Sequence, residues 1–415
     1  MREDWVEVEF NDVLEIVSGK NQKQVISDDG KYPIYGSGGI IGRAKEYLCE
    51  EGTTIIGRKG TINSPIFVKQ QFWNVDTAFG LSAFPILNKR LLFFFAVYFN
   101  FKKLDKSTTI PSLAKRDLLK ISIPLCSLPE QRAIVAKIEE LFSDLDQGIA
   151  DLKKALDQLK VYRQAVLKKA FEGDWEKTSV GELFDFVGGG TPSKREKDYW
   201  NGHIPWASVK DIKGDYLEKT QDFITKKGLN NSSANLAQKS EIILITRISP
   251  GKSLVTSIDT AINQDLKIIK PKAEIFNKYI HYLFKSIERI CIKFSSGTTV
   301  KGINLTNLKS IEIPVIEAKE QHQIVQEIES RLSVCDKVEK DIALAIERSR
   351  NLRQSILKKA FEGRLLSEAE VSVCKAAPDY EPASVLLARI ERSRNEKIKA
   401  EAFSKTKVSE GKKKR

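Results

Sequence analysis

The sequence is poor in the residues that cross-link small secreted domains or build metal sites. Its 415 residues include only five cysteines and three histidines, and no two cysteines form a Cys-x-x-Cys pair. Neither a disulfide framework nor a structural zinc site is therefore indicated. Scattered single thiols of this kind predict a reducing, cytoplasmic setting.

Long hydrophobic runs are also missing. The longest apolar stretch, residues 91–99, is far too short to span a bilayer, and the first residues, Met-Arg-Glu-Asp-Trp, do not begin an apolar export segment. The hydrophobic share of 41% is nevertheless enough for packed cores, and the length suffices for two domains of ordinary size plus long helices. We expect a soluble protein with no membrane partner.

Sequence motifs of self-sufficient DNA enzymes are lacking as well. Residues 246–253 imitate the end of a phosphate-binding loop, but Thr246 stands where the first glycine is required. Gly-Ser-Gly-Gly at 36–39 fails as a dinucleotide fingerprint, because Ile41 takes the third glycine position. We find no methyltransferase motif of the Asn-Pro-Pro-aromatic type and no His/Cys metal cluster. The chain is therefore interpreted as a binding protein with no catalytic residue, metal or cofactor of its own.

What the sequence does contain is an internal duplication. Residues 123–175 align with residues 313–365 at a fixed offset of 190, without a gap, and 21 of the 53 positions are identical. Glu130-Gln131 recurs as Glu320-Gln321, and Leu-Lys-Lys-Ala-Phe-Glu-Gly is repeated in full at 167–173 and 357–363. A period this long indicates duplicated modules with pseudo-two-fold symmetry rather than a solenoid of short repeats.

Each copy carries the apolar spacing of a long helix. Steps of three and four residues predict a coiled-coil-like seam, and a helix over 129–171 would be roughly 60 Å long. Because one helix cannot bury its own seam, we expect the two copies to pair, antiparallel. A spacer without any docking role remains an alternative. The predicted seam residues are Ile138, Phe142, Leu145, Ile149, Leu152, Leu156, Leu159, Ile328, Leu332, Cys335, Ile342, Ile346, Leu352 and Ile356.

The net charge of +13 lies outside the helical copies. Residues 1–122 carry +3, residues 176–312 carry +6 and the tail from 366 carries +4. A basic surplus on folded modules suits nucleic acid, although a merely basic protein would share it. Glycine-rich and basic turns, such as 35–39 and 57–61, could present amides and guanidinium groups to DNA, although ordinary hairpins use the same residues.

Two blocks make the chain resemble a known family. The second globular region carries Gly-Gly-Thr-Pro-Ser-Lys at 189–194, then Tyr-Trp at 199–200, Ile-Pro-Trp at 204–206 and Lys-Asp-Ile at 210–212. The first carries related blocks at 35–42, 57–61 and 73–78. In this order, with the two helical copies, they resemble the specificity (S) subunits of type I restriction-modification systems over nearly the whole chain.

The resemblance implies a fold and a division of labour. The expected fold class is α+β, with two mixed α/β target recognition domains separated by two long helices. The expected segments are recognition domains at 1–122 and 175–312, helical repeats at 123–174 and 313–365, and a basic extension at 366–415. Each recognition domain would bind half of a bipartite, asymmetric site on double-stranded DNA. Two modification (methyltransferase) subunits and the restriction (translocase-nuclease) subunits would be partners, and these would use S-adenosylmethionine, ATP and magnesium.

Candidate DNA contacts follow from basic and hydroxyl side chains in the predicted turns. Arg58 and Arg247 follow similar strand-like runs and are the preferred groove contacts, each worth about 1 to 3 kcal/mol of discrimination if paired with guanine. The full set is Lys20, Asn21, Lys23, Ser37, Arg43, Arg58, Lys59 and Thr61 in the first domain, and Thr191, Ser193, Lys194, Arg195, Ser208, Lys210, Arg247, Lys252 and Ser253 in the second.

The tail departs from a plain two-repeat plan. Residues 368–380 are predicted to be irregular, residues 382–403 to form a basic helix that docks on a partner subunit, and the last dozen residues to be disordered. A stand-alone bipartite DNA-binding protein would share the basic domains and helices but would recruit no methyltransferase. A self-sufficient enzyme ranks last.

Overall fold

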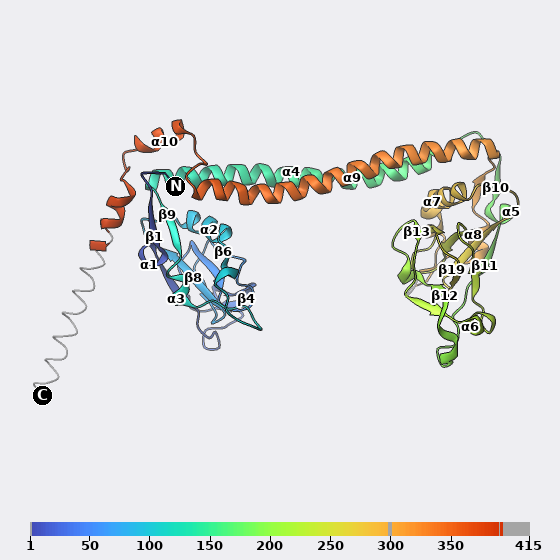
Figure 1. The fold of residues 1–415 in the computed structure, drawn as a ribbon, viewed down its shortest axis with the longest axis horizontal. Helices are drawn as coiled ribbons and strands as arrows, with labels where there is room; N and C mark the ends of the chain where they lie inside the picture. Colours follow the sequence, from blue (N-terminus) through green and yellow to red (C-terminus); the bar gives the residue numbers. More distant parts are fainter. Residues whose placement is uncertain (1, 298–300, 390, 393–415) are drawn as a thin grey trace, which may run out of the picture. The chain divides into compact units, whose positions relative to one another are not determined.

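The protein, described by a computed structural model, forms two compact units (Figure 1). Unit 1 comprises Met1–Asp151 and Ala345–Arg415, and unit 2 comprises Leu152–Leu344. The structure describes residues 2–297, 301–389 and 391–392. Two long helices, α4 (Leu128–Ala170) and α9 (Ala318–Phe361), each run from one unit into the other.

Unit 1 is a mixed domain built on three small sheets. The strand orders are β2-β8-β5-β6, β4-β3-β7 and β1-β9. Its elements are β1 (Val6–Glu9), α1 (Phe10–Val13), β2 (Leu14–Ser18), β3 (Tyr32–Gly36), β4 (Gly39–Ala44), β5 (Thr53–Gly57), β6 (Ile66–Val68), β7 (Trp73–Asn74), β8 (Ala78–Ala83), α2 (Lys89–Tyr98), a 3₁₀ turn (Phe101–Leu104), α3 (Lys115–Leu118) and β9 (Ser122–Leu125).

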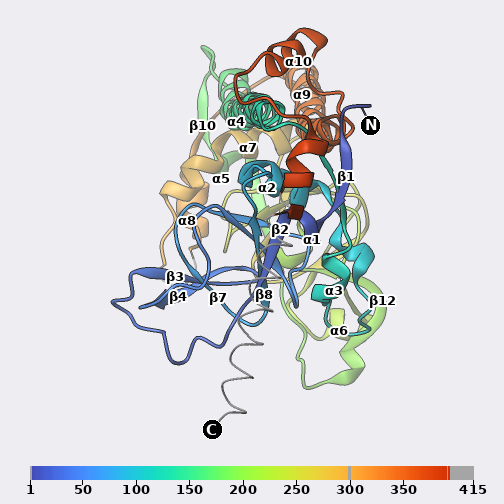
Figure 2. The same ribbon diagram turned by 90° about the vertical axis from the view of Figure 1, so that its left-hand side faces the viewer.

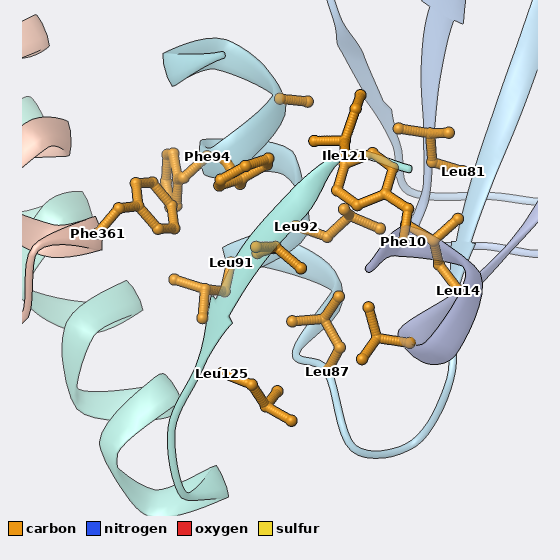
Figure 3. Packing of buried hydrophobic residues seen from close by; sticks show 14 of the residues in the cluster. Phe10, Leu14, Leu81, Leu87, Leu91, Leu92, Phe94, Ile121, Leu125 and Phe361 are labelled. Atoms are coloured by element: carbon orange, nitrogen blue, oxygen red, sulfur yellow. The ribbon is translucent and has the colours of Figure 1, made fainter. Parts of the chain in front are cut away.

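The core of unit 1 lies between its central sheet, α2 and the long helices. Asn88 caps α2 by accepting hydrogen bonds from the backbone of Arg90 and Leu91, so the apolar stretch at residues 91–99 begins in a capped helix. Figure 3 shows the aromatic and aliphatic side chains that α2 contributes, with Phe361 of α9 packed beside them. The Phe361 ring meets that of Phe95 edge-on, with centroids 5.1 Å apart. The end of the second helical copy thus completes the core of the first globular domain.

Unit 2 repeats the plan with a larger sheet. Its strand orders are β11-β19-β16-β17-β13, β14-β12-β18-β15 and β10-β20. Its elements are β10 (Lys177–Ser179), α5 (Val180–Leu183), β11 (Phe184–Gly188), β12 (Trp200–Ala207), β13 (Tyr216–Leu217), β14 (Asp222–Ile224), α6 (Lys226–Asn230), β15 (Asn235–Ala237), β16 (Ile242–Ile245), β17 (Ser253–Thr256), β18 (Thr260–Ile262), β19 (Leu266–Pro271), α7 (Asn277–Lys293), α8 (Leu305–Lys309), β20 (Glu312–Pro314) and 3₁₀ turns at Lys197–Tyr199 and Val209–Asp211.

Helix α7 takes in unit 2 the place that α2 takes in unit 1. Both lie beside the long helices, on the side of their sheet that faces α4 and α9 (Figure 1). Phe284 of α7 packs against Phe184 of β11, with ring centroids 5.5 Å apart, in the core of unit 2. Strands β12 and β14, with α6, lie at the end of unit 2 away from the helices.

The predicted seam is observed along α4 and α9, which lie side by side (Figure 2). Ile138, Ile328, Cys335, Ile342 and Ile356 are buried, and most other predicted seam positions are half-buried. The fold class is therefore confirmed: mixed α+β domains with two long, paired helices. The helix expected over 129–171 begins at Leu128 and ends at Ala170.

One predicted seam residue is wrong. Leu352 is 49% exposed. It lies six positions after Ile346, which turns its side chain well away from the contact face at about 100° per residue. Arg353 occupies the face instead, with its guanidinium 4.8 Å from the ring centroid of Phe142.

Reciprocal ion pairs confirm the antiparallel pairing. In unit 1, Arg353 of α9 pairs with Asp146 of α4. In unit 2, Arg163 of α4 pairs with Asp336 of α9 at 2.6 Å. Arg353 and Asp336 are the offset-190 counterparts of Arg163 and Asp146, so each copy gives the other the same contact. Such isologous exchange is what a two-fold relation between antiparallel helices produces.

The repeated Glu-Gln pair ties each long helix to its globular domain. In unit 1 the indole of Trp5 donates to Glu130 at 3.1 Å, and Gln131 accepts from the backbone of Asn88 at 2.7 Å. In unit 2 Trp175 donates to Glu320 at 3.1 Å, and Gln321 accepts from the backbone of Phe276 at 3.1 Å. The identity of these positions in the two copies therefore reflects a buried structural role.

The described part of the tail corrects one prediction and confirms part of another. Residues expected to be irregular include α10 (Glu368–Lys375), which Ser367 and Glu370 start with a reciprocal capping box. Residues 383–389 are helical, as predicted, and Ala383 and Leu386 are buried in the core of unit 1. Docking of this helix on a partner subunit stays a prediction. Residue 390 and residues 393–403 of the predicted helix, and the last dozen residues, lie outside the described residues.

Candidate nucleic-acid interface

In unit 1 most predicted DNA contacts lie on exposed loops. Lys20, Asn21 and Lys23 follow β2, and Lys59 and Thr61 follow β5, all with exposed side chains. The indole of Trp73 donates to the carbonyl of Lys20 at 3.1 Å, which fixes the start of the first loop. These loops are ordered by the fold while their basic groups face solvent.

Two predicted stretches meet at the turn after β5. A Cβ atom built on Gly60 would lie 3.8 Å from the hydroxyl of Ser37, so the hairpin between β3 and β4 reaches this turn. Arg58 is half-buried and donates to the carbonyl of Asp76 at 3.4 Å, with its guanidinium 5.7 Å from the Phe79 ring centroid. The turn therefore combines a hydroxyl, an oriented guanidinium and the exposed Lys59.

Arg43 makes structural hydrogen bonds that the sequence did not predict. Its guanidinium donates to the carbonyls of Gly30 at 2.5 Å and Lys31 at 3.0 Å. These bonds tie β4 to the preceding turn. Arg43 can still add positive potential, but two of its donor groups are already used.

In unit 2 a hollow of about 670 Å³ brings three predicted residues together. Lys194, Ser208 and Lys210 line it, and sequence reasoning missed the rest: Lys197, Trp200, Asn201, Trp206 and Asp222. Its wall holds two indoles in an edge-to-face arrangement, with centroids 5.3 Å apart. Aromatic faces beside ammonium groups are suited to a nucleotide, with stacking on the ring and phosphate on the cations.

The hollow is built by indole hydrogen bonds to the glycine-rich block. Trp206 donates to the carbonyl of Gly190 at 3.0 Å, and Trp200 donates to that of Ser193 at 3.2 Å. Gly190 is required because a Cβ there would lie 2.7 Å from the backbone carbonyl carbon of Ser233 and 2.8 Å from the backbone nitrogen of Ala234. Lys194, Lys197 and Trp200 are spaced three residues apart in the sequence, and this spacing was a usable signal for two of the missed residues, Lys197 and Trp200.

The lysines of the hollow differ in how they are engaged. Lys210 pairs with Asp222 at 2.6 Å, and this hydrogen bond raises the pKa of its ammonium group. Lys194 and Lys197 are exposed and have no ion-pair partner among the residues that the structure describes. These two are free to neutralise phosphate.

Other predicted residues of unit 2 lie on exposed loops or have structural roles. Ser193 and Arg195 are exposed, and the hydroxyl of Thr191 bonds to Gln264 at 2.6 Å. Ser208 is buried and donates to Asp211 at 3.0 Å, capping the turn that follows β12.

The structure contradicts the prediction for Ser253. This residue is 1% exposed on β17 and donates to the backbone carbonyl of His281 at 3.1 Å. Its side chain points from the sheet toward α7, so it offers no surface to DNA. The neighbouring Lys252 is half-buried.

Backbone pairing shows which loop residues of the two units correspond. In unit 1, Gly60 donates to the carbonyl of Pro111 and Lys59 bridges Ser112. In unit 2, Ile248 donates to the carbonyl of Lys301 and Arg247 bridges Gly302. Because 111–112 and 301–302 match at the offset of 190, Arg247 corresponds to Lys59, not to Arg58 as the sequence runs suggested. Both are exposed cations after the central strand, and Arg247 also contacts Asp265 at 3.2 Å.

Comparison with protein families decides the assignment. The family described as Type I restriction modification DNA specificity domain matches residues 2–156 and 172–348. The chain belongs to this family. The two matches cover both globular domains, as the duplication predicted, and the DNA-specificity role is confirmed over that of a stand-alone binder.

Two relatives of this type I specificity chain come from Escherichia coli. It is 31% identical to the EcoR124I/EcoR124II specificity subunit over 219 residues, half of this chain and 54% of that protein. It is 24% identical to the EcoDI specificity subunit over 94% of this chain and 95% of that protein. The second similarity spans both domains and both helical copies.

Solved structures share the fold of this type I specificity chain. A chain from a study of complex assembly and conformational transition of the type I R-M system gives a TM-score of 0.68 at 18% identity, covering 88% of this chain and 99% of that one. The HsdS subunit from Thermoanaerobacter tengcongensis gives 0.57 at 19% identity, covering 88% and 98%. Within the described residues, no helix has the length and apolar character needed to cross a membrane.

Proposed function

We propose that the chain is the non-catalytic DNA-specificity subunit of a type I restriction-modification complex. Residues 1–122 and 175–312 form its recognition domains, and each binds one half of a bipartite, asymmetric site. The helical repeats, 123–174 and 313–365, set the length of the unread gap between the halves and dock partner subunits. Residues 366–415 form a basic extension, in which Ala383 and Leu386 lie in the core of unit 1.

The partners proposed are two modification (methyltransferase) subunits and the restriction (translocase-nuclease) subunits. S-adenosylmethionine, ATP and magnesium belong to them. The complex acts on double-stranded DNA in the cytoplasm.

One observation carries the proposal beyond family membership. Two modules of one chain present an exposed cation, Lys59 or Arg247, at the same point of the same backbone frame. The surrounding loops differ in sequence and in contacts. Two different readers on one frame are what a bipartite, asymmetric site requires.

We infer that the hollow of unit 2 holds the DNA backbone rather than a specific base. Lys194 and Lys197 neutralise phosphate, and the Trp200 ring packs against a sugar or base face. Phosphate contacts of this kind set position and register without carrying sequence information. The hollow is therefore the anchor of the second domain, and the loop with Arg247 is its reader.

Co-purification tests the assembly. The full-length chain is co-expressed with a candidate adenine methyltransferase of its host, and DNA exposed to the complex and to each component is sequenced for methylation. A split adenine-methylated motif that needs both components is expected. Motif methylation by the methyltransferase alone would contradict the role, and specific DNA binding without assembly would restore the stand-alone binder.

Salt-dependent binding tests the anchor. Lys194→Ala with Lys197→Ala should weaken binding to cognate and unrelated duplexes by the same factor. It should also lower the slope of log affinity against log salt by about 0.9 per lost phosphate contact. Lys337→Ala with Lys340→Ala on α9 removes the same charge from exposed positions of unit 2 and is the matched control. A loss confined to one cognate sequence would make the hollow a base reader instead.

A further inference from the structure

Ile248 has a backbone conformation that its side chain disfavours. Its φ is +75°, in the left-handed region, and its counterpart Gly60 has a φ of +80°. Among non-glycine residues with positive φ in the described parts of the chain, Asn201, Ser240 and Ile248, only Ile248 is β-branched. A β-branched residue there is strained, because its Cβ substituents crowd the backbone. Unit 1 uses the residue that avoids this cost, and unit 2 does not.

Burial of the Ile248 side chain does not offset this strain. The Ile248 side chain is 57% exposed, and it belongs to none of the hydrophobic clusters of described residues in unit 2. The backbone is held all the same, because Ile248 donates to Lys301 at 2.8 Å and Ile303 donates to Thr246 at 2.9 Å. An exposed isoleucine alone would mean little. A strained and exposed isoleucine in a pinned turn points to a contact outside the chain.

The surroundings indicate which kind of contact. Arg247 precedes Ile248, with half of its side chain exposed, and the exposed Lys301 lies across the turn. The acid in contact with Arg247 is Asp265, whose side chain is only 14% exposed. A single apolar group framed by cations suits the edge of a base pair flanked by phosphates better than an apolar protein surface.

We propose that Ile248 is a specificity-determining residue of the second domain that contacts the 5-methyl group of a thymine in the major groove. The methyl group distinguishes thymine there from the other bases, and apolar side chains recognise it by direct contact. Arg247 holds the adjacent backbone or guanine, and the pinned turn presents both side chains together. The inference rests on the proposed DNA-specificity function.

Glycine substitution separates the strain from the contact. Ile248→Gly relieves the backbone, so hydrogen exchange in β16 and β17 should slow and the unfolding midpoint of unit 2 should rise. Ser240→Gly relieves a φ of +73° on an exposed turn of the same unit and is the matched control. Both variants should be stabilised, but only Ile248→Gly should change DNA preference.

Selection from a randomised duplex library, with the full-length chain alone and with its methyltransferase, gives the readout. The wild-type motif should contain a thymine whose preference falls by about fivefold or more in Ile248→Gly, the lower end of what one mismatched pair costs. Other positions and bulk affinity should be unchanged. Replacing that thymine with uracil, which lacks the methyl group, should weaken wild type by the same factor and leave Ile248→Gly unaffected.

The outcomes are distinct. A stabilised Ile248→Gly with an unaltered motif, or a wild type indifferent to uracil, overturns the proposal and leaves the specificity function standing. Loss of methyltransferase binding in Ile248→Gly with an unaltered motif would make the residue a protein contact. A wild type that selects no motif in either form overturns the proposed function and this inference together.

Discussion

Units 1 and 2 share a frame of buried polar contacts and differ in the loops that the frame supports. In both, an indole donates to the glutamate of the repeated Glu-Gln pair, and the glutamine accepts from the start of α2 or α7. In both, the strand that precedes the long helix pairs with the first strand of the domain. These contacts fix where each domain joins its helix. The DNA-reading loops make none of these contacts, so their sequences can differ between the units. At one position with positive φ, unit 1 has Gly60 and unit 2 has Ile248.

The units also differ in what closes them. Unit 1 is covered by the chain's own extension, in which Leu386 is 1% exposed within its core, and Asp379 pairs with Arg132 at 2.8 Å. Unit 2 instead has a fifth strand, β13, beside β17 in its main sheet. Symmetry of the frame therefore coexists with separate means of stabilising each domain.

The largest loss of stability is expected from removing the shared buried polar contacts in one unit only. Gln131 is fully buried; it accepts from Asn88 and donates to the carbonyls of Ile86 and Cys126. Gln131→Leu leaves three polar groups unpaired and should destabilise unit 1 by roughly 3 kcal/mol. Hydrogen exchange of α2 and β9 measures this loss.

The matching substitution should cost less. Gln321 pairs with Phe276 and Ile316, and the described residues of unit 2 hold no counterpart of the Ile86 contact. Gln321→Leu should therefore destabilise unit 2 by about 2 kcal/mol. Exposed Gln147→Leu is the control. Equal losses in the two units would show that the third hydrogen bond contributes nothing.

A second prediction concerns the cover of unit 1. Leu386→Ala removes a buried side chain from the core and should destabilise unit 1 by about 2 to 3 kcal/mol, while leaving unit 2 unchanged. The neighbouring Val385 is 50% exposed, and Val385→Ala should have almost no effect. If Leu386→Ala spared unit 1 but impaired assembly with the methyltransferase, the tail would be a partner contact, as the sequence alone suggested.

Features with local or repeated signals could be predicted from the sequence. The duplication gave the paired helices and their antiparallel sense, and α4 is shifted by one residue at each end from the expected range. Helix α10 was missed although Ser367 and Glu370 have the spacing of a capping box, so its signal was present. The prediction for Leu352 was wrong because it gave more weight to hydrophobicity than to the residue's angular position around the helix. Arg353 packs on Phe142 in its place.

The candidate site was less predictable, because its contacts join distant residues. Ser253 was expected to be free, and the hydroxyl's bond to His281 spans 28 positions. The role of Trp200 in the hollow depends on Trp206 and Ser193, which only the folded loop places around it. Local composition predicted most of the basic residues correctly as surface features, but it failed for the buried Ser208 and Ser253 and could not say which donors the fold had already used.

A pH profile tests how the additional strand of unit 2 is held. Burial alone would raise the pKa of Asp215, but the His281 ring 3.9 Å away and the hydrogen bond from Lys285 at 2.6 Å outweigh it and hold that pKa well below its usual range. The stability that Asp215 contributes is therefore fully present above its unfolded pKa of about 4, and it is lost as the pH falls from there through the folded pKa.

Asp215→Asn should destabilise unit 2 by about 1 kcal/mol at neutral pH, because the carboxylate is partly exposed and screened. The difference from wild type should shrink as the pH falls below about 4. Exchange of the β13 and β17 amides against pH measures it. A difference that persisted in acid would mean that packing, and not ionisation of Asp215, holds the strand.

The smallest effect separates the two reciprocal ion pairs. Arg353 pairs with Asp146 and stacks on Phe142, whereas the offset-190 counterpart of Phe142 in unit 2 is Leu332. Lysine keeps the charge but loses the planar stacking group. Arg353→Lys should therefore cost about 0.5 to 1 kcal/mol at any salt concentration, because stacking of the cation on the ring is screened little.

Arg163 pairs with Asp336 and Glu339, whose carboxylates are exposed, and none of the described residues places an aromatic ring beside its guanidinium. Arg163→Lys should therefore cost less than about 0.5 kcal/mol, and that cost should fall as salt rises. Amide exchange at low and high salt compares the two variants, in the turn of α4 that faces Arg353 and in the turn of α9 that faces Arg163. Identical costs and identical salt responses would mean that the seam is as symmetric in energy as in geometry. Phe142 would then be an apolar seam residue like Leu332, and the aromatic contact would not distinguish unit 1.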